Sequence, residues 1–144
     1  MYDDILFPTD DSVSTEATTE HARDIASGRD ATVHVLYVID DRSFLTLDDE
    51  VQSEVLDELR ADGEAATDAV ASELAEDGIE VTTALARGDP AEEILSYAEN
   101  TDIDLVTMGT RGDDYTENML GSTAQTVVSR SSVPVLTVPL GDEE

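Results

Sequence analysis

Short apolar runs alternate with longer segments of helical periodicity along this chain. Five runs are short, rich in branched residues and closed by turn signals, so each is expected to form a buried strand. The expected strands are residues 5–10, 31–39, 79–86, 103–108 and 133–138.

Helices are expected between these strands, because apolar residues recur there at spacings of three and four. Ser12 or Ser14 can cap the first helix and Gly28 ends it; Pro90 suits the first position of the third, and the fourth is expected over 122–129. The second ends before Gly78 and contains Gly63, which we interpret as a weak point because glycine costs about 1 kcal/mol relative to alanine in a helix. The positions expected on the apolar faces of the first three helices are Ala17, His21, Ala22, Ile25, Ala26, Val51, Val55, Leu56, Leu59, Ala65, Ala66, Ala69, Val70, Leu74, Ile94, Leu95 and Ala98.

The alternation of strands and helices predicts right-handed βαβ units. We therefore expect an α/β fold, with a mostly parallel five-stranded sheet and helices on both faces. A chain of 144 residues suits a single domain of ordinary size, so residues 1–144 are expected to form one doubly wound domain.

The chain carries 35 acidic and seven basic residues, has no lysine, and has a formal net charge of -28. This charge opposes binding to nucleic acid. The acids are spread along the chain, and at about 1 M ionic strength the Debye length is only about 3 Å, so repulsion between them is screened. We interpret the composition as adaptation to a halophile's cytoplasm; a surface shaped for one basic partner is the alternative.

The sequence has no cysteine, so disulfides and thiolate metal sites are excluded. The N-terminus has neither a basic region nor a long apolar segment, and we expect no signal peptide and no membrane partner. A cytoplasmic location is therefore predicted.

Three strand ends carry candidate binding residues. In open α/β sheets, ligands bind beyond the carboxyl ends of the strands, where the strand order reverses. The ends to inspect are Pro-Thr-Asp at 8–10, Val-Ile-Asp at 38–40 and Met-Gly-Thr-Arg-Gly at 108–112.

The glycine-rich segment 109–122 is the strongest of these candidates. Gly109 and Gly112 allow a tight turn and a close approach to a ligand, and Gly121 with Ser122 begins a helix whose free N–H groups favour an anion. Thr123 adds a hydroxyl donor. A tight turn followed by a helix cap, with no ligand, explains the same residues.

The segment resembles the nucleotide-binding signature of the universal stress protein family, which is Gly, two residues, Gly, nine residues, then Gly-Ser or Gly-Thr. The resemblance covers the full length and includes residues 8–10, 38–40, 86–90 and 133–138. It implies strand order 3-2-1-4-5 and an adenine-nucleotide switch or sensor that binds ATP, AMP or ADP, with or without Mg²⁺. It also implies a homodimer through the edge strand 133–138, where Val133, Val135, Leu136 and Val138 suit burial.

The resemblance also assigns the site residues. It places Pro8, Thr9, Asp10 and Val38 beside the nucleoside. On the phosphate side, it places Met108, Gly109, Gly112, Gly121, Ser122 and Thr123. Arg111, the only cation of the loop, is either a further phosphate contact or a solvated surface residue paired with an acid.

Two features depart from the family pattern. Only eight residues separate Gly112 from Gly121, and Asp113 and Asp114 stand where a basic residue is common in the family. Each carboxylate near 4 Å from a phosphate charge costs about 1 kcal/mol in water-like surroundings. A dimeric stress-response interaction protein that has lost ATP binding is therefore the alternative function.

No catalytic group is predicted. No nucleophile with a neighbouring base can be assembled, and His21 and His34 are interpreted as packing at the edge of the core, without a metal. Asp10 and Asp11 resemble the acidic pair of receiver domains, but that chemistry needs a lysine, and the Gly-Lys-Ser or Gly-Lys-Thr of a P-loop is also missing. At most, slow Mg²⁺-dependent ATP hydrolysis is expected, not enzymatic turnover.

Overall fold

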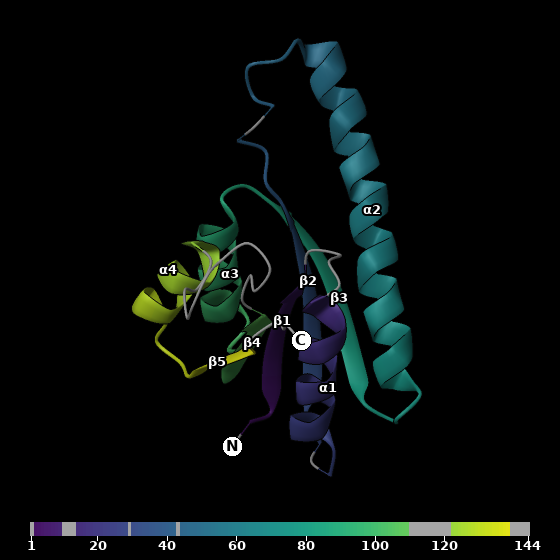
Figure 1. The fold of residues 1–144 in the computed structure, drawn as a ribbon, viewed down its shortest axis with the longest axis vertical. Helices are drawn as coiled ribbons and strands as arrows, with labels where there is room; N and C mark the ends of the chain where they lie inside the picture. The colour runs from purple at the N-terminus through teal and green to yellow at the C-terminus, as the bar shows by residue number, and fades with distance from the viewer. Residues whose placement is uncertain (1, 10–13, 29, 43, 110–121, 139–144) are drawn as a thin grey trace, which may run out of the picture.

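The structure is a computed structural model that describes residues 2–9, 14–28, 30–42, 44–109 and 122–138. Strands and helices alternate along it, as expected (Figure 1). The strands are β1 (Asp4–Thr9), β2 (Thr32–Ile39), β3 (Glu80–Arg87), β4 (Leu105–Gly109) and β5 (Val135–Val138). The helices are α1 (Ser14–Ala26), α2 (Asp49–Ala75), α3 (Pro90–Asn100) and α4 (Ser122–Arg130).

The strands form one sheet in the order β3-β2-β1-β4-β5, and every pairing is parallel. The predicted α/β class and strand order are confirmed. Strand β5 begins two residues later than expected because Pro134 precedes it, although the Pro134 carbonyl still accepts a hydrogen bond from the Val106 N–H at 3.0 Å.

Helices cover both faces of the sheet, with α1 and α2 on one face and α3 and α4 on the other (Figure 1). Alternation along the strands divides the core between these layers. On β1, Ile5 and Phe7 pack with the layer of α1 and α2, whereas Leu6 packs with the layer of α3 and α4. Such strands are buried on both faces, which explains their continuous apolar runs.

Helix α2 corrects two sequence interpretations. Gly63 is not a weak point: it is buried, and a Cβ there would lie 2.6 Å from Cδ1 of Tyr37 and 2.9 Å from Cδ2 of Leu85. The absence of a side chain lets α2 approach β2 and β3 closely. The predicted apolar face is only partly buried, since Val51, Ala65 and Ala69 are exposed.

Three helix ends follow the predicted signals. Gly28 and Gly78 have φ of 78° and 79°, the left-handed conformation that ends α1 and α2. Asp89 caps α3 by accepting from the Ala91 N–H at 3.0 Å, and Pro90 is the first helical residue. Ser14 is the first residue of α1, whereas Ser12 lies outside the described residues.

Candidate nucleotide-binding edge

The carboxyl ends of the strands lie along one edge of the sheet, because all five strands are parallel. The chain runs from β1 to β2 and β3 on one side, and then to β4 and β5 on the other. Strand order therefore reverses between β1 and β4. This is the position at which α/β sheets of this type bind ligands.

The predicted nucleoside-side residues lie on neighbouring strands at this edge. Pro8 is half-buried, and Thr9, the last residue of β1, is 8 % exposed and lies in register with Tyr37 of β2. Val38 is the next residue of β2 and packs against the core beneath α3 and α4. Asp10 lies outside the described residues.

The predicted phosphate-side residues are described in part. Gly109 ends β4 and is half-buried, while Met108 is buried beneath it. Ser122 is the first residue of α4, and Thr123 follows it with a half-buried side chain. The other residues singled out in this loop, Arg111, Gly112, Asp113, Asp114 and Gly121, lie outside the described residues.

Strands β1 and β4 are neighbours, paired at Ile5–Leu105 and Leu6–Val106. The ends of these two strands, Pro8 and Thr9 on one and Met108 and Gly109 on the other, therefore lie on the same side of the sheet. The start of α4 is compatible with an anion in a way that two other helices are not. Its first turn has no acidic residue, whereas the first turns of α2 and α3 carry two each. Free N–H groups in a first turn that itself carries no carboxylate suit phosphate.

An ion-pair network at the same edge was not anticipated from the sequence. Arg42 donates from Nε to Oδ1 of Asp40 at 2.8 Å and from Nη2 to Oδ2 at 2.7 Å, and reaches Oδ2 of Asp89 at 3.3 Å. Arg87 donates to Oδ2 of Asp41 at 2.9 Å. Hydrogen bonding to Arg42 lowers the pKa of Asp40 below its usual value.

This network ties the loop after β2 to the loop after β3. Its signal in the sequence is the run Asp-Asp-Arg at 40–42 following a strand. The two arginines lie near the predicted nucleoside residues but are already engaged by carboxylates.

The two histidines differ from their predicted role. His21 is exposed, so its assignment to the edge of the core is wrong. His34 is buried as expected, but in a polar cluster: its Nδ1 is 2.9 Å from the Tyr97 hydroxyl and its Nε2 is 3.0 Å from Oδ1 of Asp4. Asp4 begins β1, so this cluster lies toward the opposite edge of the sheet.

Burial raises the pKa of Tyr97, and the charge of Asp4 adds to the effect. The carboxylate of Asp104 accepts from the backbone N–H groups of Asp3 and Asp4, which fixes the start of β1. Since every member has a partner, the cluster is structural.

Within the described part of the chain, no group of three or more histidine, aspartate or glutamate residues is placed to hold a metal ion. Nor does any described helix have the length and apolar character needed to cross a membrane.

Comparison with known proteins agrees with this fold. The sequence model described as "Universal stress protein family" matches residues 1–139. Universal stress protein MJ0531 of Methanocaldococcus jannaschii is 39 % identical over 141 residues, which cover 96 % of this chain and 82 % of the relative.

Solved structures of other proteins have the same fold. The hypothetical protein MJ0577 of the same organism superposes with a TM-score of 0.90, 30 % identity and 99 % coverage of both chains. A universal stress protein solved in complex with cAMP shares the fold at a TM-score of 0.71 and 19 % identity. The universal stress protein of Archaeoglobus fulgidus in complex with dAMP shares it at a TM-score of 0.66 and 18 % identity. At least 95 % of each chain is covered in both comparisons.

Proposed function

Because the chain belongs to the universal stress protein family, we propose that it binds an adenine nucleotide and acts as a switch or sensor rather than a turnover enzyme. The observation that carries the proposal is the meeting of the ends of β1, β2 and β4 at the edge where strand order reverses. Complexes of related folds with cAMP and dAMP support adenine nucleotides as the ligand class.

The nucleoside side of the proposed site consists of Pro8, Thr9, Asp10 and Val38. A threonine hydroxyl and a carboxylate can hydrogen-bond to a ribose, and a half-buried valine offers an apolar contact for the base. The charge-free start of α4 and the backbone at Gly109 form the phosphate side, together with Met108, Arg111, Gly112, Gly121, Ser122 and Thr123. These groups fit ATP, ADP or AMP, and bound Mg²⁺ would offset the charge of Asp113 and Asp114.

The first experiment identifies what the protein carries. Small molecules released from protein purified in molar KCl are identified by mass spectrometry, and ATP is then titrated with and without Mg²⁺. We expect a copurifying adenine nucleotide or saturable binding. If no nucleotide is released and ATP binding does not saturate up to about 1 mM, a limit of roughly 4 kcal/mol, the proposal is overturned.

Single substitutions then test where the nucleotide binds. Gly112→Val should block ATP binding, and Ser122→Ala should weaken it. Ser72→Ala, which removes an exposed hydroxyl from the far end of α2, should bind like the parent. Equal affinities in all three variants would mean that ATP binds elsewhere.

A nucleotide-free interaction protein is the second candidate, favoured by the short acidic segment after Gly112. It retains the fold and the dimer but gains no thermal stability from ATP. Thermal melting with and without ATP separates the two functions.

We propose a homodimer through β5 in both cases. β5 pairs only with β4 among the described strands, so its outer edge is open to a second copy. The chain has no cysteine, so Thr137→Cys offers a direct test. Oxidation should yield crosslinked dimers, and Ser72→Cys should not; equal crosslinking or a monomeric mass by sedimentation would exclude this interface.

We also propose that the protein works in the cytoplasm of a halophile. The net charge of -28 supports this, because dense carboxylates repel one another unless salt screens them. Circular dichroism should detect a loss of native fold when KCl is dialysed away. A thermal midpoint independent of KCl would contradict the proposal.

A further inference from the structure

Exposed apolar side chains gather at the beginning of α2 and in the loop before it. Leu45, Leu47 and Val51 are 52 %, 41 % and 41 % exposed, and the other large apolar residue this exposed in the described chain is Val128 of α4. Helix α2 extends past the end of the sheet here (Figure 1). We call residues 44–59 the tip.

The tip has a defined structure. The Gln52 side chain donates to the carbonyls of Leu45 at 3.0 Å and Leu47 at 2.6 Å, which fixes the loop against the first turns of α2. Phe44 is only 4 % exposed, and its buried side chain anchors the loop to the rest of the protein. Leu45 and Leu47 are therefore held beside Val51 as one surface.

The apolar face of α2 runs continuously into this surface. Val51, Val55 and Leu59 follow one another at intervals of four, and Val55 and Leu59 are half-buried. The same face is buried from Gly63 onward, where the helix lies on the sheet. The exposed part of this face is thus available to a partner.

Acidic residues are dense around the beginning of α2. Residues 48–58 contain six acids among eleven residues, whereas the whole chain contains 35 among 144. All six are exposed, and no basic residue lies between Arg42 and Arg60. The density is more than twice that of the chain, so the general acidity does not account for it.

We propose that the tip is a docking surface for a basic amphipathic helix of a partner protein. Apolar residues of that helix pack between Leu45, Leu47 and Val51, and its lysines or arginines face the surrounding carboxylates. A second copy of this chain is a poorer occupant, because its tip has no basic residue to pair with these carboxylates. The surface does not depend on nucleotide binding at the edge of the sheet.

The test uses a designed helical peptide with a leucine face and lysines elsewhere, and a second peptide of equal charge with serine in place of leucine. Binding is followed by fluorescence anisotropy without nucleotide, at the lowest KCl concentration that preserves the circular dichroism of the native fold. We expect the leucine peptide to bind more tightly. The double variant Leu45→Ser/Val51→Ser should weaken it at least about tenfold, and Val128→Ser should not.

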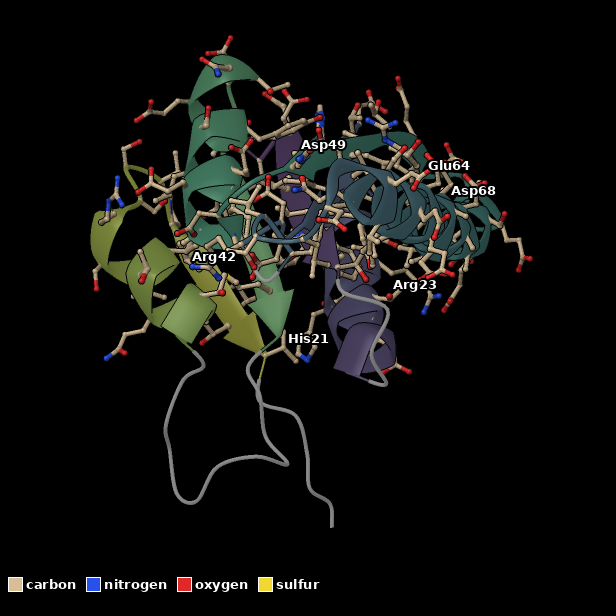
Figure 2. The ribbon with its side chains drawn as sticks, turned by 90° about the horizontal axis from the view of Figure 1, so that it is seen from above. His21, Arg23, Arg42, Asp49, Glu64 and Asp68 are labelled. Carbon is tan, nitrogen blue, oxygen red and sulfur yellow. The ribbon has the colours of Figure 1, made fainter. Side chains whose placement is uncertain are left out.

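A second pair of variants tests the charge. Glu54→Gln/Glu58→Gln should weaken binding and flatten its salt dependence. The control variant Glu64→Gln/Asp68→Asn removes the same amount of charge from the same helix beyond the tip, and should leave binding unchanged. Both control side chains lie on the outer side of α2, and Asp49 shows where the tip is (Figure 2).

The outcomes are distinct. No binding of the leucine peptide, equal binding of both peptides, or equal effects of tip and control variants would overturn the proposal, the last two because they indicate attraction to net charge alone. Self-association that the Leu45→Ser/Val51→Ser variant abolishes would overturn it in favour of a contact between copies. Because nucleotide is absent throughout, these results leave the nucleotide proposal to its own test.

Discussion

Gly63 lies where α2 packs closely on the sheet, and replacing it with alanine sets two effects against each other. Helix propensity favours alanine by about 1 kcal/mol in an exposed helix interior. The new Cβ, however, would lie 2.6 Å from Cδ1 of Tyr37 and 2.9 Å from Cδ2 of Leu85. Contacts this short require the ring, the leucine or the helix to move.

Overpacking a well-filled interface costs about 1–3 kcal/mol. The backbone of Tyr37 is held on β2 between β1 and β3, so its ring can leave the new Cβ only by rotating about its own side-chain torsions. We therefore expect Gly63→Ala to lower the free energy of unfolding by about 1 kcal/mol, after the propensity gain is offset.

Urea unfolding in constant KCl, followed by circular dichroism, measures this change. Ala61→Gly at an exposed position two residues earlier is the control, and should lose about 1 kcal/mol from propensity alone. Leu85→Ala should make Gly63→Ala less damaging in a double-mutant cycle, since it removes one of the two close atoms. A Gly63→Ala protein more stable than the parent would refute the close-approach argument.

Three further predictions concern individual side chains. Asp89→Ala should destabilise the protein by about 1 kcal/mol in urea melts through loss of the α3 cap, whereas exposed Asp68→Ala should change stability little; equal effects would contradict the capping role. His34→Ala removes the hydrogen-bonding partner of half-buried Tyr97 and Asp4 and should cost about 1 kcal/mol, against little for exposed His21→Ala, so a His34 variant as stable as the parent would argue against the polar cluster. Because burial raises the pKa of Tyr97, its neutral form favours folding: this contribution is complete below about pH 10 and is lost as pH rises through the folded pKa. Tyr97→Phe should therefore flatten the alkaline decline in stability, and an unchanged decline would mean that other groups cause it.

The fold could be predicted because each signal was local and the signals agreed. Pro90 at a helix start and glycines at 28 and 78 mark boundaries through their own backbone preferences. Buried parallel strands appear as unbroken apolar runs such as 35–39, and no run of this length occurs in the described helices. Strand order came from the family resemblance, because periodicity alone does not say which strands pair.

Gly63 and His21 were misread for the same physical reason. Propensity treats a glycine as a cost to its own helix, but whether a strand lies against that helix is a tertiary fact. Likewise, helical spacing placed His21 with alanines, although the helix turns it outward. The partners of His34 are 30 and 63 residues away in sequence, so spacing could not reveal them.

The placement of arginine extends this argument to the charged surface. Arg23 joins α1 to Glu73 of α2, Arg87 joins β3 to Asp41, and Arg130 joins α4 to Glu92 of α3. Each of these pairs connects elements that are distant in sequence, and a planar guanidinium suits such ties better than lysine does. Exposed pairs of this kind each contribute only about 0–1 kcal/mol and weaken in salt, so they add little to the stability of the fold. Residues 48–58 have no basic residue of their own to form such a pair. A lysine or arginine of a docking partner therefore pairs with a carboxylate there without displacing a basic residue of the same segment.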